Sequence, residues 1–340
     1  MAYTTINKST DYFNTNLIPS ASEITAVGHQ ADMIWLKSRT AGHSHEMIDT
    51  VRGISKKLKT DATSAESTDA NIITAIGSDS YTVGSSSNSI YGGNNGVGWS
   101  WKANGTGSAN TDGSINSTVS ANTTSGFSIM TYTGNGSAGA TIGHGLGAVP
   151  KMLIVKQLDI ANNWKVYHVS MGNNNIMNLN DNSAQAGNTA FWNDTTPTPT
   201  LITLGTNGAI NGSGATYVMY AFAEKPGYSK FGSYTGNGNI DGPFAYTGFK
   251  PNFIMLKNTV DSGDNWTIYD SSRDPNNKSE NLLFANSNST EADGNFMDIL
   301  SNGFKQRNTS NGNNGNGDKL IYMAFGQSIV GSNNVPATAK

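Results

Sequence analysis

An internal repeat constrains the fold of this 340-residue chain more than any other feature of its sequence. Residues 132–136 read Tyr-Thr-Gly-Asn-Gly, and the same motif returns at 234–238. Each copy is followed by a proline, by an apolar run that ends in a lysine, and by a tryptophan. These landmarks are Pro150, Lys156 and Trp164 after the first copy and Pro251, Lys257 and Trp266 after the second. Self-similarity at this spacing predicts tandem structural units.

A weaker third copy lies near the start of the chain. The run HQADMIWLK at 29–37 matches the segment from proline to lysine, with Ala31 in place of the proline. HEMIDTVR at 45–52 matches WTIYDSSR at 266–273, and VGWSWK at 97–102 matches the aromatic strand that closes the other copies. The alignment superimposes two pairs of charged residues, Asp49 with Arg52 and Asp270 with Arg273, and places His168 in the position of the two aspartates.

We therefore expect three units joined by two different connections. The stretch from 105 to 126 has the Gly, Ser, Asn and Thr content of a flexible linker or a long surface loop, whereas the second and third units follow each other almost directly. The first unit lacks the Tyr-Thr-Gly-Asn-Gly motif, so we expect it to be divergent and able to dock on another protein. The expected divisions are residues 10–104, 105–126, 127–226, 228–330 and a tail at 331–340.

Within each unit the sequence predicts β-strands and no long helix. Runs such as MLIVK at 152–156 are short, rich in β-branched and aromatic residues, and bounded by Gly, Asn, Pro or Asp. Trp99 and Trp101 lie two apart and therefore share one face of a strand. We expect an all-β protein of three tandem antiparallel β-sandwich or barrel-like units. Its predicted core tryptophans are Trp35, Trp99, Trp101, Trp164 and Trp266.

Composition excludes several classes of function. Charged residues make up 13 % of the chain, the net charge is −3 and no dense basic cluster occurs, so we expect no nucleic-acid partner. No segment approaches the about 20 apolar residues of a membrane-spanning helix. The lack of cysteine excludes disulfides, thiolate nucleophiles and thiolate zinc sites.

The sequence holds few candidates for chemistry, and we expect no catalytic residues and no cofactor. It has neither a phosphate-binding loop with a Gly-Lys-Ser/Thr ending nor a Gly-x-Ser-x-Gly turn before a helix. His43 and His45 lie two apart and are weak candidates for a metal site, with a solvated turn as the alternative. The runs at 261–266 and 274–280 contain oxygen ligands suited to Ca²⁺ but lack the EF-hand spacing.

The remaining candidates are one surface contact and two polar clamps. Trp192 lies in a Pro- and Thr-rich loop that has no match in the other units. Trp192, Asn193 and Asp194 are therefore the predicted contacts to a sugar or a protein, with local packing as the alternative. For the aligned aspartate–arginine pairs we expect an ion pair or a turn clamp inside each unit, with a shared ligand site as the alternative.

The repeated landmarks resemble those of a repeated domain of unknown function that is common in virion proteins of tailed bacteriophages. The matching text is GFSIMTYTGNGSAGATIGHGLGAVPKMLIVK with NWKVYH, then GYSKFGSYTGNGNIDGPFAYTGFKPNFIMLK with NWTIYDSSRDP and FMDILSNGFK. The first unit is similar through DMIWLKSR, DTVRG and VGWSWKANG. The resemblance spans residues 10–330 and implies a place in a phage particle. It supplies no catalytic residues.

We therefore expect a non-enzymatic virion structural protein, assembled in the host cytoplasm, that belongs to the tail fibre or adsorption apparatus and recognises the host surface. Amide- and hydroxyl-rich loops on a β-scaffold suit recognition of a glycan or protein there. One alternative is a capsid decoration or structural connector protein, whose partners are other virion proteins. Another, from a different class, is a polysaccharide depolymerase. The resemblance also implies a homo-oligomer, with a trimer favoured.

Overall fold

The computed structural model describes residues 4–20, 22–87 and 95–330 of the chain. Strands account for 45 % of the residues and helices for 5 %, so the prediction of an all-β protein is confirmed. Neighbouring strands of every described sheet pair antiparallel, as expected. The predicted tail at 331–340 lies outside the described residues.

The first sheet has four strands in the order β1-β9-β3-β4. Their bounds are Phe13–Ile18 (β1), Gly96–Trp101 (β9), Met33–Ser38 (β3) and Glu46–Asp49 (β4). A short 3₁₀ turn, η1 (Ser9–Asp11), precedes β1. Two small sheets accompany it, formed by β2 (Glu23–Ile24), β8 (Tyr81–Val83) and β7 (Ile73–Ile76), and by β5 (Lys56–Lys57) and β6 (Ser67–Thr68).

The second sheet has eight strands in the order β10-β11-β12-β19-β14-β15-β16-β17. Their bounds are Ser108–Asn110 (β10), Ser117–Asn122 (β11), Phe127–Thr133 (β12), Thr216–Ala223 (β19), Pro150–Gln157 (β14), Lys165–His168 (β15), Asn175–Asn178 (β16) and Ala186–Gly187 (β17). Beside it lie a two-stranded sheet, β13 (Ala140–Gly143) with β18 (Leu201–Leu204), and the short helices α1 (Thr189–Trp192) and α2 (Gly208–Asn211).

The third sheet also has eight strands, in the order β20-β27-β22-β23-β24-β25-β26-β21, and it curls into a nearly closed barrel. Their bounds are Ser229–Thr235 (β20), Lys319–Ser328 (β27), Phe249–Asn258 (β22), Thr267–Asp270 (β23), Ser279–Phe284 (β24), Ala292–Leu300 (β25), Gly303–Gln306 (β26) and Phe244–Tyr246 (β21). One short helix, α3 (Asn311–Asn314), lies beside it.

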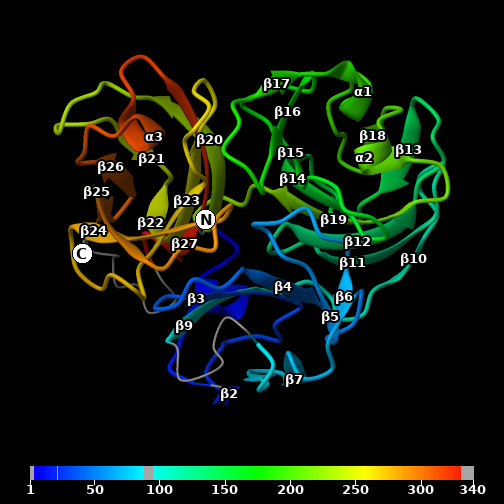
Figure 1. Ribbon diagram of the computed structural model, residues 1–340, viewed down its shortest axis with the longest axis horizontal. Coiled ribbons are helices and arrows are strands. Elements are labelled where there is room, and N and C mark those ends of the chain that lie inside the picture. Colours follow the sequence, from blue (N-terminus) through cyan, green and yellow to red (C-terminus); the bar gives the residue numbers. More distant parts are fainter. Residues whose placement is uncertain (1–3, 21, 88–94, 331–340) are drawn as a thin grey trace.

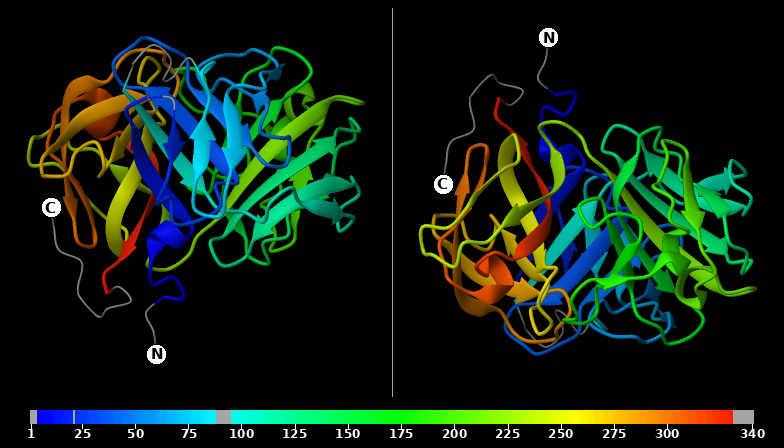
Figure 2. Two further views of the ribbon diagram at one scale, coloured as in Figure 1. Left: turned by 90° about the horizontal axis from the view of Figure 1, so that it is seen from below. Right: turned by 90° about the horizontal axis from the view of Figure 1, so that it is seen from above.

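The same order of four strands recurs in all three sheets. The series are β1-β9-β3-β4, β12-β19-β14-β15 and β20-β27-β22-β23. The pairing registers define corresponding positions on the inner strands, which are Trp101 with Met33, Phe222 with Met152, and Phe325 with Phe253. We call the elements β1 to β9 the first lobe, β10 to β19 the second and β20 to β27 the third. Figure 1 shows the three lobes around a common centre, and the two views of Figure 2 show them side by side.

One hydrophobic core is shared by the three lobes. At its centre lie three rings from corresponding positions, Trp101, Phe222 and Phe325, with centroids 5.7, 6.0 and 6.4 Å apart. Each lobe also has its own core on the opposite face of its sheet. Because both faces are covered, every residue of β3 and β9 is buried, which explains why their sequences do not alternate. The predicted core tryptophans are confirmed, since Trp35, Trp99, Trp101, Trp164 and Trp266 are each at most 1 % exposed.

Residues 105–126 are not a flexible linker. They contain β10 and β11, and β11 pairs along its whole length with β12. Ile115 and Val119 reach into the core of the second lobe and are 6 and 7 % exposed. Composition does not reveal these strands, because alternate residues of a strand near the edge of a sheet face solvent and can be polar. Only the residues on the other face need to be apolar.

The repeated Tyr-Thr-Gly-Asn-Gly motif fastens the end of a strand to a short helix. In the second lobe the Tyr132 hydroxyl donates to Ile210 O at 2.7 Å, and the backbone N–H of Asn135 donates to Asn211 Oδ1 at 3.0 Å. The third lobe repeats both bonds, from Tyr234 to Asn313 O at 2.6 Å and from Asn237 to Asn314 Oδ1 at 2.9 Å. The motif therefore recurs for a structural reason.

Candidate functional site

The aligned aspartate–arginine pairs clamp the turns that follow β4 and β23. Asp49 Oδ1 accepts the backbone N–H groups of Val51 and Arg52, and Asp49 Oδ2 accepts from Arg52 Nε at 2.6 Å. Asp270 and Arg273 repeat this arrangement, also with 2.6 Å between Oδ2 and Nε. The side chains of both pairs are at most 2 % exposed, so the prediction of a turn clamp is confirmed.

Each clamp also binds a neighbouring lobe. The Tyr220 hydroxyl of the second lobe donates to Asp49 Oδ2 at 2.7 Å. Trp99 Nε1 of the first lobe donates to Asp270 Oδ2 at 3.1 Å. Tyr220 and Trp99 hold corresponding positions on β19 and β9, each two residues before its ring in the central triad. The clamps therefore lie at the junctions between lobes.

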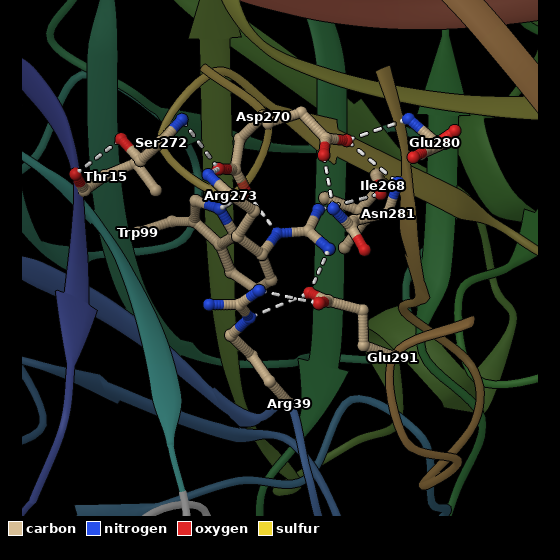
Figure 3. A network of polar contacts seen from close by, with 11 residues as sticks. Thr15, Arg39, Trp99, Ile268, Asp270, Ser272, Arg273, Glu280, Asn281 and Glu291 are labelled. Carbon is tan, nitrogen blue, oxygen red and sulfur yellow. Dashed lines mark hydrogen bonds and ion pairs between the residues drawn. The ribbon is translucent and has the colours of Figure 1, made fainter. Parts of the chain in front are cut away.

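The arginine of the third-lobe clamp is enclosed by neutralising contacts, which Figure 3 shows. Arg273 Nη1 donates to Glu291 Oε2 at 3.0 Å and Nη2 donates to Ile268 O at 3.0 Å. Its guanidinium lies 5.9 Å from the centre of the Trp99 ring. Arg39 of the first lobe binds the same Glu291 through two bonds of 2.7 and 2.9 Å. The network thus joins the first and third lobes without leaving a buried charge unpaired.

Glu66 plays the part of Glu291 in the first lobe, where its Oε1 accepts from Arg52 Nη1 at 3.1 Å. In the second lobe all three charged positions, the aspartate, the arginine and the glutamate, change together. His168, Met171 and Gln185 stand where the first lobe has Asp49, Arg52 and Glu66. His168 Nε2 bonds to Tyr322 O of the third lobe at 3.1 Å. The third-lobe residue that corresponds to Trp99 is Met323, whose side chain has no N–H or O–H group to offer a carboxylate. A histidine that bonds to the backbone therefore suits this junction better than an aspartate.

Three corresponding side chains tie each lobe to another through a backbone carbonyl. The bonds run from Trp164 Nε1 to Lys59 O, from Trp266 Nε1 to Asn178 O and from His45 Nε2 to Phe284 O, at 2.8, 2.8 and 2.9 Å. They join the second lobe to the first, the third to the second and the first to the third. The three bonds form a closed cycle around the shared core.

Both ring nitrogens of His45 are occupied, Nε2 by the bond of this cycle and Nδ1 by a bond within the first lobe. Trp35 Nε1 donates to His45 Nδ1 at 2.8 Å, so the proton of the imidazole is on Nε2, which donates to Phe284 O. Burial lowers the pKa of His45 to about 3. His45 is therefore not free to bind a metal ion with His43, which is half-buried in the loop before β4. Residues 4–20, 22–87 and 95–330 contain no cluster of three or more His, Cys, Asp or Glu side chains that could hold a metal ion.

A backbone hydrogen bond also crosses each junction at corresponding places. The bonds run from Glu66 N to Leu158 O, from Gln185 N to Thr259 O and from Glu291 N to Arg39 O, at 2.9, 3.0 and 2.8 Å. Each acceptor comes two residues after the lysine that ends the apolar run. Burial lowers the pKa of each of these lysines, Lys37, Lys156 and Lys257, to about 8.

Trp192 is not an exposed contact residue. It lies in α1, is 1 % exposed and packs edge to face on Tyr167, with centroids 5.7 Å apart. The short helix folds the loop back and turns the ring inward, so local packing accounts for this tryptophan. Asn193 and Asp194 follow it with φ of 50° and 49° and are exposed.

The two oxygen-rich runs are occupied by contacts within their own loops. Asp264 Oδ2 accepts from Asn258 Nδ2 at 2.9 Å. Asp274 Oδ2 accepts the backbone N–H groups of Glu280 and Asn281 at 2.9 and 2.8 Å. These carboxylates stabilise the turns in which they lie.

A polar groove of about 760 Å³ lies on the second lobe beside α1 and α2. We call it the amide groove, and the residues used below to define it are Gln157, Ile160, Lys165, Asn188, Phe191 and Asn207. Sequence reasoning does not find this groove because its walls come from separate segments. The only local signal is an asparagine before each of the two short helices, which is typical of a helix N-cap.

No helix in the described part of the chain has the length and apolar character to cross a membrane. Residues 8–328 match a family described as "Domain of unknown function (DUF7483)". No curated protein and no solved structure matches the chain.

Proposed function

The chain belongs to the DUF7483 family over nearly its whole length, and the description of that family names no function. We propose that the chain is a non-enzymatic structural protein of a tailed-bacteriophage particle. We assign it to the tail fibre or adsorption apparatus, where it meets the host surface. The resemblance of its repeated motifs to those of phage virion proteins supports the setting. The structural role is supported by the buried hydrogen bonds between lobes, at the clamps and in the cycle, which we call the junction network.

The junction network uses the side chains that a catalytic site would need. Asp49 and Asp270 are buried and accept hydrogen bonds from a neighbouring lobe, and Arg52 and Arg273 are buried in ion pairs with them. His45 and His168 are also buried and bond to another lobe. Groups held in this way stabilise the arrangement of the lobes and are withheld from solvent and substrate. The same residues that stand out in the sequence therefore favour a scaffold.

Within this proposal the chain consists of three copies of one β unit that close into a ring. The matching strand orders, the central triad of rings and the cycle of side-chain bonds support this architecture. The start of the described chain also bonds to its last strand, through Ser9 N to Gln327 Oε1 at 3.0 Å and Gln327 Nε2 to Asn7 O at 2.8 Å. A closed scaffold holds its surface loops in fixed positions, which favours binding over large conformational change.

Competition for adsorption tests the proposal. Purified chain is added to host bacteria before the phage that encodes it, and the free phage is titrated over time. We expect the chain to bind the cells and slow adsorption, with antibody against the chain labelling the tail in electron micrographs. Light scattering of the same preparation gives the molar mass and so tests whether the chain forms the predicted trimer.

Other outcomes favour the alternatives. Label confined to the capsid, with adsorption unaffected, would support a decoration or connector protein. Release of reducing ends from the host polysaccharide by the purified chain would show a depolymerase and overturn the non-enzymatic proposal.

A further inference from the structure

We infer that the amide groove of the second lobe binds a neutral sugar unit of a glycan. This inference rests on the proposed function, because it names the ligand class through which such a protein would recognise a surface. The groove volume, about 760 Å³, lies within the range of about 300–1,000 Å³ that is usual for small-ligand sites.

Two asparagine side chains in the lining of the groove have free hydrogen-bond donors. Asn188 Oδ1 accepts from Ala190 N at 3.0 Å, and Asn207 Oδ1 accepts from Ala209 N at 2.9 Å. Because the two carbonyl oxygens cap α1 and α2, the Nδ2 groups of both asparagines are left as donors. Neither Nδ2 group makes a hydrogen bond within the described part of the chain.

Gln157 adds a third donor at the same place. Its side chain is 4 % exposed, and its Oε1 accepts from Asn162 Nδ2 at 2.8 Å. Its Nε2 has no partner among residues 4–20, 22–87 and 95–330. Since Gln157 Nε2 is not among the buried side-chain atoms that lack a partner, it reaches the groove, where water or a ligand can accept from it. A lining with three free amide donors favours a ligand rich in acceptor oxygens.

The charge of the groove is balanced, which favours a neutral ligand. Lys165 Nζ donates to Asn178 Oδ1 at 2.8 Å and lies 5.2 Å from the centre of the Phe191 ring. Asn178 Nδ2 donates in turn to Asp181 Oδ2 at 2.6 Å, which brings a carboxylate close to the lysine. Asp181 does not line the groove, but its negative charge acts on Lys165 and offsets the attraction of the lysine for a phosphate or an acidic peptide.

The apolar part of the groove suits the C–H faces of a sugar ring. Ile160 is 55 % exposed at its rim, and the buried Phe191 lines its wall. Hydroxyl groups around an aliphatic ring match a lining of amide donors and apolar side chains. Sugar hydroxyls can also donate to the water that fills the rest of the groove.

The third lobe shows how the corresponding space is closed when no groove forms. Asn258 holds the position of Gln157, and its Nδ2 bonds to Asp264, Asn311 and Asp318. Thr267 holds the position of Lys165 and bonds to Asn313 Oδ1 at 3.1 Å. The Nδ2 group of Asn258 is thus satisfied internally in the third lobe, whereas the Nε2 group of Gln157 is open in the second. The difference points to a ligand and not to a requirement of the fold.

The test uses variants that remove donors and keep the helix caps. In the full chain, Asn188→Asp with Asn207→Asp retains both Oδ1 acceptors and replaces both free Nδ2 groups with oxygen. Asn193→Asp, at the exposed turn after α1, is the matched control. Saturation-transfer-difference NMR and calorimetry measure binding of the methyl glycosides of glucose, galactose, mannose and N-acetylglucosamine, with glucuronate and inorganic phosphate as charged probes.

We expect at least one neutral glycoside to bind, the double variant to bind about tenfold or more weakly at an unchanged melting temperature, and the control to bind normally. Equal binding by the double variant, binding of none of the neutral glycosides, or tighter binding of glucuronate or phosphate would overturn the inference. If the chain slows phage adsorption and the double variant does so equally well, the inference fails while the proposed function stands. If a glycoside binds but the chain has no effect on phage adsorption, the inference stands and the proposed function fails.

Discussion

Trp35 donates its indole N–H to Nδ1 of His45 at 2.8 Å, and the two rings lie edge to face with centroids 5.7 Å apart. At the corresponding pair of positions the second lobe has Ile154 with Trp164, and the third has Met255 with Trp266. One large ring and one smaller side chain therefore fill the space in each lobe. The large ring comes from β3 in the first lobe and from the residue just before β15 or β23 in the other two. Total volume is conserved, as close packing requires.

Exchange of this pair in the first lobe is predicted to be strongly non-additive. Trp35→Ile leaves a cavity and is expected to cost about 2–4 kcal/mol, whereas His45→Trp overfills the site and is expected to cost about 1–3 kcal/mol. The double variant copies the second lobe, so its free energy of unfolding should exceed that of either single variant. Urea denaturation of all four proteins measures the coupling. A double variant no more stable than the worse single variant would contradict the correspondence.

Acid is predicted to weaken the junctions through two histidines. Burial lowers the pKa of His45 to about 3 and of His168 to about 4, against 6.5 for an unburied imidazole. Below pH 6.5 the unfolded chain binds more protons at these positions than the folded chain, so the free energy of unfolding falls as the pH drops from 6.5 toward 4. Melting temperatures between pH 4 and pH 7 should show this fall.

The same measurement on the Trp35→Ile, His45→Trp variant identifies the source. With one of the two histidines removed, its stability should change less steeply over the same pH range. An identical slope in both proteins would assign the acid sensitivity to other groups.

The clamp of the first lobe is predicted to tolerate replacement only as a set. Arg52→Met leaves the buried Asp49 carboxylate without its cation and is expected to cost about 3–5 kcal/mol. Adding Asp49→His and Glu66→Gln removes the orphaned charges and copies His168, Met171 and Gln185 of the second lobe. This triple variant should be more stable to urea than Arg52→Met alone. If it is less stable, the joint substitution in the second lobe has another cause.

Local patterns account for the parts of the fold that the sequence predicts. The bonds from Asp49 to Arg52 span three residues, and strand composition and spacing suffice to place the core tryptophans. The junctions are different, because Trp164 meets Lys59 across 105 positions and His45 meets Phe284 across 239. No local pattern specifies which carbonyl a buried indole or imidazole will reach.

Two expectations failed because weak signals were outweighed by tertiary packing. The helix that buries Trp192 has four residues, too few to give a helical period. Residues 105–126 have the composition of a linker, yet β10 and β11 pair with the second sheet and Ile115 and Val119 lie in its core. The amide groove was out of reach for a related reason, since caps and strand residues become one surface only after folding.

Glycine in the repeated motif is predicted to be required by close packing. A Cβ on Gly134 would lie 2.5 Å from Gly212 O, so Gly134→Ala must displace backbone and is expected to cost about 1–3 kcal/mol. Gly208→Ala is the matched control, because a Cβ there meets nothing within 4 Å and the residue begins α2. Alanine at that helical position should stabilise the fold by about 0.5 kcal/mol. Urea denaturation separates the two, and equal effects would show that contact with the short helix does not explain the motif.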